Sequence, residues 1–142
     1  MEDIFDPLRK KFVRLTPEEQ VRQWFIGVLH KTAGVPLTHM MSEVQLHIGG
    51  KSLRADIIVY DRKLREVCIV ECKEPSVRLD GDVLEQALRY DMAVGVPYIC
   101  ITNGKKTFFF KRTSGEGAPY GYMDRLPAYE EMAAAAGQKG II

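Results

Sequence analysis

The order of the predicted helices and strands indicates an α/β fold, with a central mixed β-sheet of about five strands flanked by helices. Helical and strand-like apolar patterns succeed each other as one helix, a three-strand meander, a helix, two strands and a last helix. The composition agrees, because 46% hydrophobic and 27% charged residues are typical of a globular chain with a buried core. We expect a single domain over residues 1–142, with its core at about 16–137 and frayed ends.

The first helix is predicted to begin at Thr16. Thr16 suits the N-cap, Pro17 the first helical position, and Glu19 completes a capping box. Gly34 ends the helix. Glu18 falls on the apolar face and Glu19 off it, so Glu18 is expected to point inward, unless both acids simply favour the helix dipole. The apolar face consists of Val21, Trp24, Phe25, Val28 and Leu29.

Three strands are expected next, as a meander. Residues 43–48 alternate as a strand does, and Gly49-Gly50 forms the turn after it. Residues 57–60 and 67–70 are rich in β-branched side chains, and the polar stretch 61–65 between them is a typical hairpin connection. The sequence therefore predicts an antiparallel hairpin at the centre of the chain.

Two acids and a lysine flank this hairpin. If its turn is centred between Lys63 and Leu64, positions whose numbers sum to 127 lie opposite each other, and Asp56 and Glu71 satisfy that sum. Their Cβ atoms would be roughly 4.5–5.5 Å apart, where two anions repel unless a cation is present. Lys73 shares the face of Glu71. A bulge near Asp56 would change this register, and an ordinary salt-bridge cluster is the alternative to a cation site.

The second half of the chain is expected to return to the sheet through a helix. Asp80 or Asp82 caps this helix, on which Gln86 and Tyr90 are four residues apart and share a face. Both could lie near Lys73, or they could simply border the core stripe. The expected elements are the helix to about Val94, a strand over 98–102, a turn at Asn103-Gly104, a strand over 107–111, a loop over 115–121 and a helix over 127–136.

The net charge of the chain argues neither for nor against a nucleic-acid partner. The formal net charge is +1, whereas many nucleic-acid binders have a strong basic excess. The basic residues do form local clusters, which are more typical of solvated loops or strand ends than of a phosphate track. These clusters are Arg9-Lys10-Lys11, Arg62-Lys63, Lys105-Lys106 and Lys111-Arg112.

The cysteines and the chain ends indicate a cytoplasmic protein. Cys68, Cys72 and Cys100 all lie in apolar runs without metal-ligand spacing, so we expect buried, reduced thiols. No apolar run approaches the roughly 20 residues that span a membrane, and the N-terminus lacks the features of a signal peptide. No membrane partner is therefore expected.

Taken in order, these motifs resemble the PD-(D/E)xK nuclease superfamily, most closely the N-terminal nuclease domain of the type I restriction enzyme R (motor) subunit. The resemblance runs from about Thr16 to the helix at Pro127, and Ala55 stands where the superfamily name has a proline. It is carried by PEEQVRQWF from Pro17, ADIIVYD from Ala55, VECK ending at Lys73, EQALRY from Glu85 to Tyr90, and YICITNGKKTFFFK from Tyr98.

The resemblance implies a restriction-endonuclease-like fold and a Mg²⁺-dependent DNA endonuclease. Asp56 and Glu71 would bind Mg²⁺, for which Mn²⁺ can substitute, together with the backbone carbonyl of Cys72. Lys73 would orient or help to deprotonate the attacking water and stabilise charge on the phosphate. Phosphodiester hydrolysis needs these three contributions: a Lewis acid, an activated water and charge neutralisation.

The resemblance also implies supporting residues and partners. Glu18 corresponds to an acid of the first helix that assists metal binding, and Gln86 and Tyr90 to a pair that contacts DNA or supports the site. The expected partners are DNA and other restriction-modification subunits. The alternative is a non-catalytic module that binds nucleic acid or protein through the same fold.

Overall fold

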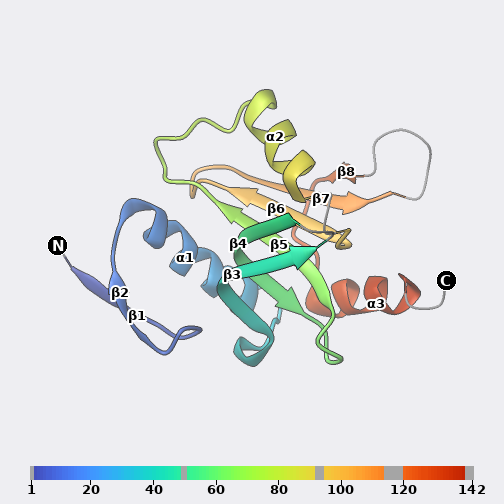
Figure 1. Cartoon of the computed structure of the whole chain (residues 1–142), viewed down its shortest axis with the longest axis horizontal. Helices are drawn as coiled ribbons and strands as arrows, with labels where there is room; N and C mark the ends of the chain where they lie inside the picture. The colour runs from blue at the N-terminus through green and yellow to red at the C-terminus, as the bar shows by residue number, and fades with distance from the viewer. Residues whose placement is uncertain (1, 49–50, 92–94, 114–119, 140–142) are drawn as a thin grey trace.

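A six-stranded mixed sheet with helices on both faces forms the framework of the protein (Figure 1). The computed structural model describes residues 2–48, 51–91, 95–113 and 120–139. The strands lie side by side in chain order, and only β5 and β6 run parallel. The predicted α/β class is confirmed, with six strands rather than about five. The strands are β3 (Met40–Ile48), β4 (Lys51–Tyr60), β5 (Glu66–Cys72), β6 (Tyr98–Thr102), β7 (Thr107–Arg112) and β8 (Tyr120–Met123).

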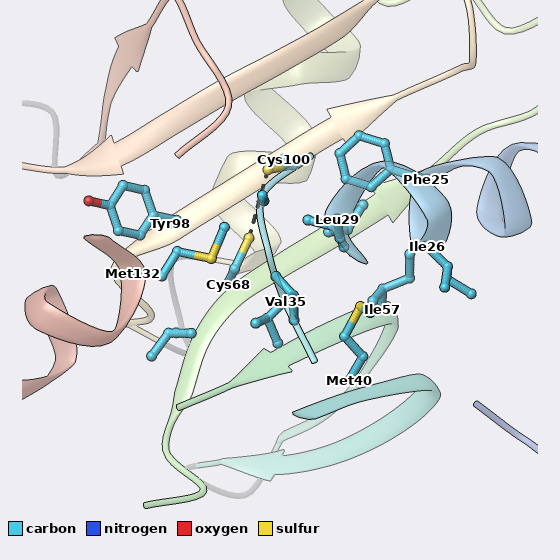
Figure 2. Packing of buried hydrophobic residues seen from close by; sticks show 14 of the residues in the cluster. Phe25, Ile26, Leu29, Val35, Met40, Ile57, Cys68, Tyr98, Cys100 and Met132 are labelled. Carbon is cyan, nitrogen blue, oxygen red and sulfur yellow. Dashed lines mark hydrogen bonds between the residues drawn. The ribbon is translucent and has the colours of Figure 1, made fainter. Parts of the chain in front are cut away.

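The helices divide the core into two clusters. α1 (Pro17–Lys31) and α3 (Tyr129–Lys139) pack on one face of the sheet, where Figure 2 shows their side chains gathered with those of β4, β5 and β6. α2 (Gly81–Asp91) covers the other face, as the crossover that a parallel β5–β6 pair requires. A 3₁₀ turn, η1 (Leu37–His39), leads from α1 into β3. Within the described ranges, no helix is long and apolar enough to span a membrane.

The capping predictions are largely confirmed. The Oγ1 atom of Thr16 accepts the backbone N–H of Glu19 at 3.1 Å, and Asp80 Oδ1 accepts that of Val83 at 3.0 Å. The predicted apolar face of α1 is partly wrong, because Trp24 is 48% exposed while Ile26 is buried.

The three cysteines are free and buried as expected, and Figure 2 marks the 3.7 Å contact between the Sγ atoms of two of them.

Three described strands that the sequence did not predict lie before the predicted core or at the end of a predicted loop. β1 (Asp3–Asp6) and β2 (Lys11–Arg14) form a hairpin before α1, in the stretch expected to fray. Each strand has four residues, and the fully buried Asp6 breaks the apolar pattern that would have indicated a strand. β8 follows residues 114–119, which lie outside the described part, as do Gly49 and Gly50 of the predicted turn.

The register of the central hairpin agrees with the predicted sum. Ile57 pairs with Val70, and the next two pairs along β4 and β5 also sum to 127. Continued one step beyond the last of these pairs, the same register would put Asp56 opposite Glu71. The irregularity of the ladder comes after Val59, on the side of the turn, so it does not disturb the end of the hairpin that carries the two acids.

Asp61 holds the turn of this hairpin. Its Oδ1 atom accepts the backbone N–H groups of Lys63 and Arg65, each at 2.9 Å, and its Oδ2 atom accepts Arg65 Nε at 2.7 Å. Burial alone would raise the pKa of Asp61, but the hydrogen bonds from Arg65 and Lys63 outweigh it and hold the pKa below the ordinary 3.8. The ionised carboxylate therefore stabilises the folded state.

Replacing Asp61 with alanine should lower the free energy of unfolding at pH 7 by about 1–3 kcal/mol, because buried hydrogen-bonding groups lose their partner. A lowered folded-state pKa gives stability that is present above about pH 4 and is lost as the pH falls through the folded-state value. The free energies of unfolding of the wild type and Asp61→Ala, measured in urea, should thus become equal as the pH is lowered. Asp61→Asn should have an intermediate value at pH 7. A difference that stays constant between pH 7 and pH 3 would contradict this role.

Candidate functional site

Asp56 connects three elements at the edge of the sheet. Its Oδ2 atom accepts the backbone N–H of Cys72 at 2.7 Å, and its Oδ1 atom accepts Arg22 Nη2 at 3.1 Å. The first bond joins the middle of β4 to the end of β5, and the second joins both to α1. The carboxylate is consequently fixed in position while its side chain remains 19% exposed.

A cleft of about 320 Å³ opens beside Asp56, between the sheet and α2. The structure brings Glu71, Lys73 and Gln86 together in its wall, with Arg54 from β4 and an apolar side formed by α2. Three of the predicted site residues therefore face one cavity, and Asp56 lies next to them rather than in its lining. The side chain of Tyr90 lies outside the described part of the chain.

Arg22 is the cation at the centre of the site. Its guanidinium is 3% exposed and forms salt bridges with four carboxylates. Burial alone would lower the pKa of Arg22, but Glu19 and then Asp56 raise it above the ordinary value. The four carboxylates are those of Glu18 (3.3 Å), Glu19, Glu43 (3.1 Å) and Asp56 (3.1 Å).

Glu19, and not Glu18, is the buried acid of α1, so the prediction that Glu18 points inward is wrong. Glu19 is 6% exposed and accepts hydrogen bonds from Arg9 (2.7 Å), Gln23 (3.0 Å) and Arg22. Arg9 belongs to the turn of the unpredicted β1–β2 hairpin, which buries this side of α1. The Glu19 carboxylate is therefore occupied by these side chains. In a capping box it would accept the backbone N–H of Thr16, but that N–H donates to Arg14 O instead.

Glu18 nevertheless lies close to the other acids. Burial raises its pKa, and the negative charge of Asp56 raises it further, although Arg22 and Lys73 act in the opposite direction. The pKa of the buried Cys72 thiol is raised by burial, then by Asp56, and to a smaller extent by Glu71 and Glu18. The carboxylates thus repel one another even with Arg22 among them, and an added cation would lower that cost.

Glu43 is a site residue that the sequence did not indicate. It has φ +53° in β3, between residues paired with Ile57 and Ala55, and so lies beside Asp56. Non-glycine residues rarely adopt this left-handed conformation, and such strain is found mainly where function requires it. Its carboxylate binds both Arg22 and Arg54. The only available signal was its position in a strand opposite Asp56.

The oxygen atoms available at the site are of the kind that binds Mg²⁺. Carboxylates of Asp56 and Glu71 and the carbonyl of Cys72 are the hard oxygen ligands that this ion prefers. In the described ranges, however, no three His, Cys, Asp or Glu side chains converge into a ready metal site. Arg22 is bonded to Asp56 Oδ1, so a cation would have to share or displace this contact.

Replacing Arg22 with methionine, which has a similar length and no charge, should lower the free energy of unfolding by about 3–5 kcal/mol, because buried carboxylates lose their counter-ion. Urea unfolding at pH 7 measures the change. Arg62→Met is the matched control, since Arg62 pairs with Glu130 on the exposed surface. Equal midpoints for the two variants would show that Arg22 does not hold the site together.

Comparisons with known proteins identify the family and the fold of the chain. A family model described as "Type I restriction enzyme R protein N terminus" matches residues 17–127. A solved structure from Vibrio vulnificus YJ016, described as a fragment of "a putative HsdR subunit of a type I restriction enzyme", matches with a TM-score of 0.64 and 22% identity. The match covers 89% of this chain and 26% of that one, so this chain spans about a quarter of its length. No curated protein matches.

Proposed function

The chain belongs to the family of type I restriction enzyme R protein N termini, and on that premise we propose that it is a Mg²⁺-dependent DNA endonuclease domain. One observation carries the proposal: Glu71, Lys73 and Gln86 line a single cleft, and Asp56 is fixed beside it by the N–H of Cys72. The match of the family model confirms the resemblance to the N-terminal domain of the type I restriction enzyme R subunit, whereas hydrolysis of DNA is our inference.

In this proposal each residue has a defined task. Asp56, Glu71 and the backbone carbonyl of Cys72 hold the divalent cation, with Glu18 as an additional acid nearby. Lys73 points into the same cleft as Glu71, so its ammonium can orient the attacking water and neutralise a phosphate oxygen. When bound, Mg²⁺ supplies a Lewis acid that lowers the pKa of water and polarises the phosphate.

Gln86 and Arg54 complete the wall of the cleft around a phosphate. Gln86 offers amide hydrogen bonds from α2, and Arg54 offers a guanidinium from β4, on the opposite side. We assign Tyr90 the same supporting role from its place one turn after Gln86 on α2. In the larger R protein, the partners of this domain would be DNA and the other subunits of the restriction-modification enzyme.

The alternative function is a non-catalytic module that binds nucleic acid or protein. The bond between Arg22 and Asp56 favours it, because an arginine already neutralises the acid that a metal would need. Cation binding separates the two functions. A titration with Mn²⁺ in a calorimeter should give heat that Asp56→Ala and Glu71→Gln abolish if the site is a metal site, and no such heat if it is not.

Nicking of supercoiled plasmid DNA in Mg²⁺ or Mn²⁺ tests the activity itself. Asp56→Ala and Lys73→Ala should each slow nicking by at least about 10²-fold, because each removes a group that stabilises charge in the transition state. Lys63→Ala is the matched control, since Lys63 lies in the turn at the other end of β4 and β5. Nicking that persists equally in all three variants would eliminate the proposed site.

A further inference from the structure

The turn between β6 and β7 is held rigidly by one side chain. Asn103 is 5% exposed, and its Oδ1 atom accepts the backbone N–H groups of Lys105 at 2.9 Å and Lys106 at 2.8 Å. Its Nδ2 atom donates to the carbonyl of Val77 at 2.8 Å, which ties the turn to the loop that follows Lys73. The side chains of the two lysines therefore extend from a backbone that the hydrogen bonds of Asn103 hold in position.

This turn lies at the same end of the sheet as the cleft. Because β5 and β6 are parallel, their carboxyl ends meet, and the backbone N–H of Lys73 donates to Thr102 O at 2.8 Å. In Figure 1 the turn lies beside the end of β5 and the loop to α2, whereas the turn between β4 and β5 lies at the opposite end. Gly104, at φ +85°, also packs against Val21 of α1.

The charge of this turn is not neutralised within the described part of the chain. Lys105 and Lys106 are exposed, and neither forms a salt bridge there. The other basic pair of the hairpin lies at the far end of β7 and is engaged, since Arg112 donates to Gly95 O at 2.9 Å and Lys111 lies over the ring of Tyr98. The sequence alone could not show which of the two basic pairs is engaged within the protein and which is exposed.

We propose that Lys105 and Lys106 bind the phosphate backbone of duplex DNA next to the cleft, assisted by the exposed Arg78 beside Val77. This inference rests on the proposed function and adds the surface along which the substrate lies. Lysine ammonium groups contact phosphates as point charges, so the turn positions DNA without reading its sequence. The rigid backbone means that little main-chain entropy is lost on binding.

Fluorescence anisotropy of a labelled DNA duplex, with Ca²⁺ in place of Mg²⁺, tests this surface. Lys105→Ala and Lys106→Ala should each weaken binding about eightfold at ~0.1 M salt and reduce the slope of log K against log[salt] by about 0.9, the loss of one phosphate contact. The loss should be the same for duplexes of different sequence. Lys63→Ala removes the same charge at the opposite end of the sheet and should bind as the wild type does.

A second variant tests whether binding depends on the fixed position of the turn or only on the exposure of the two lysines. Asn103→Ala removes no charge but releases both lysine N–H groups and the Val77 carbonyl, so it should also weaken binding, with thermal unfolding confirming that the chain is folded. The inference is overturned if the lysine variants bind like Lys63→Ala, or if the wild type gives no salt-dependent binding. The proposed function is judged separately, on Mn²⁺ heat and nicking that require Asp56.

Discussion

The ion pairs of the buried Arg22 guanidinium are the constraint on which the candidate site depends. A charge with 3% exposure is costly unless partners surround it, and here the partners come from α1, β3 and β4. The same contacts that satisfy the arginine thus bring Glu18, Glu43 and Asp56 to one point. Arg9, from the β1–β2 hairpin, extends the network by binding Glu19 and Asp6. A segment of the chain before α1 is in this way coupled to the edge of the sheet that carries the acids.

This network also determines what the cleft can bind. Four acids share one central arginine, and the pKa of Glu18 is raised first by burial and then by the negative charge of Asp56. In the adjacent cleft, which Glu71 also lines, Lys73, Gln86 and Arg54 offer donors to an anion. The acids can hold a cation, and the cleft beside them provides hydrogen-bond donors. This combination suits an anionic substrate whose charge is neutralised by a cation on one side and by side chains on the other. A phosphodiester with a divalent metal has this property.

The sequence predicted those parts of the site that depend on local pairing and missed those that depend on long-range packing. The register of the hairpin that carries Asp56 and Glu71 followed from counting across a short turn, because the pleat fixes which residues meet. The choice between Glu18 and Glu19 failed, since the hairpin that buries Glu19 has strands too short to show a pattern. Arg22 resembled a polar residue at the border of an apolar stripe, and its burial depends on acids 21 and 34 residues away.

We propose that these acids form a divalent-cation site, and a crystal of the protein grown with Mn²⁺ would reveal whether they do. Anomalous scattering at the manganese absorption edge locates the ion independently of any assumption about the protein. We expect one strong peak between the carboxylates of Asp56 and Glu71 and near the carbonyl of Cys72, with the contact between Arg22 and Asp56 Oδ1 lengthened or broken. A map without manganese at these residues, in which Arg22 still binds Asp56 Oδ1, would show that the acids do not form a cation site.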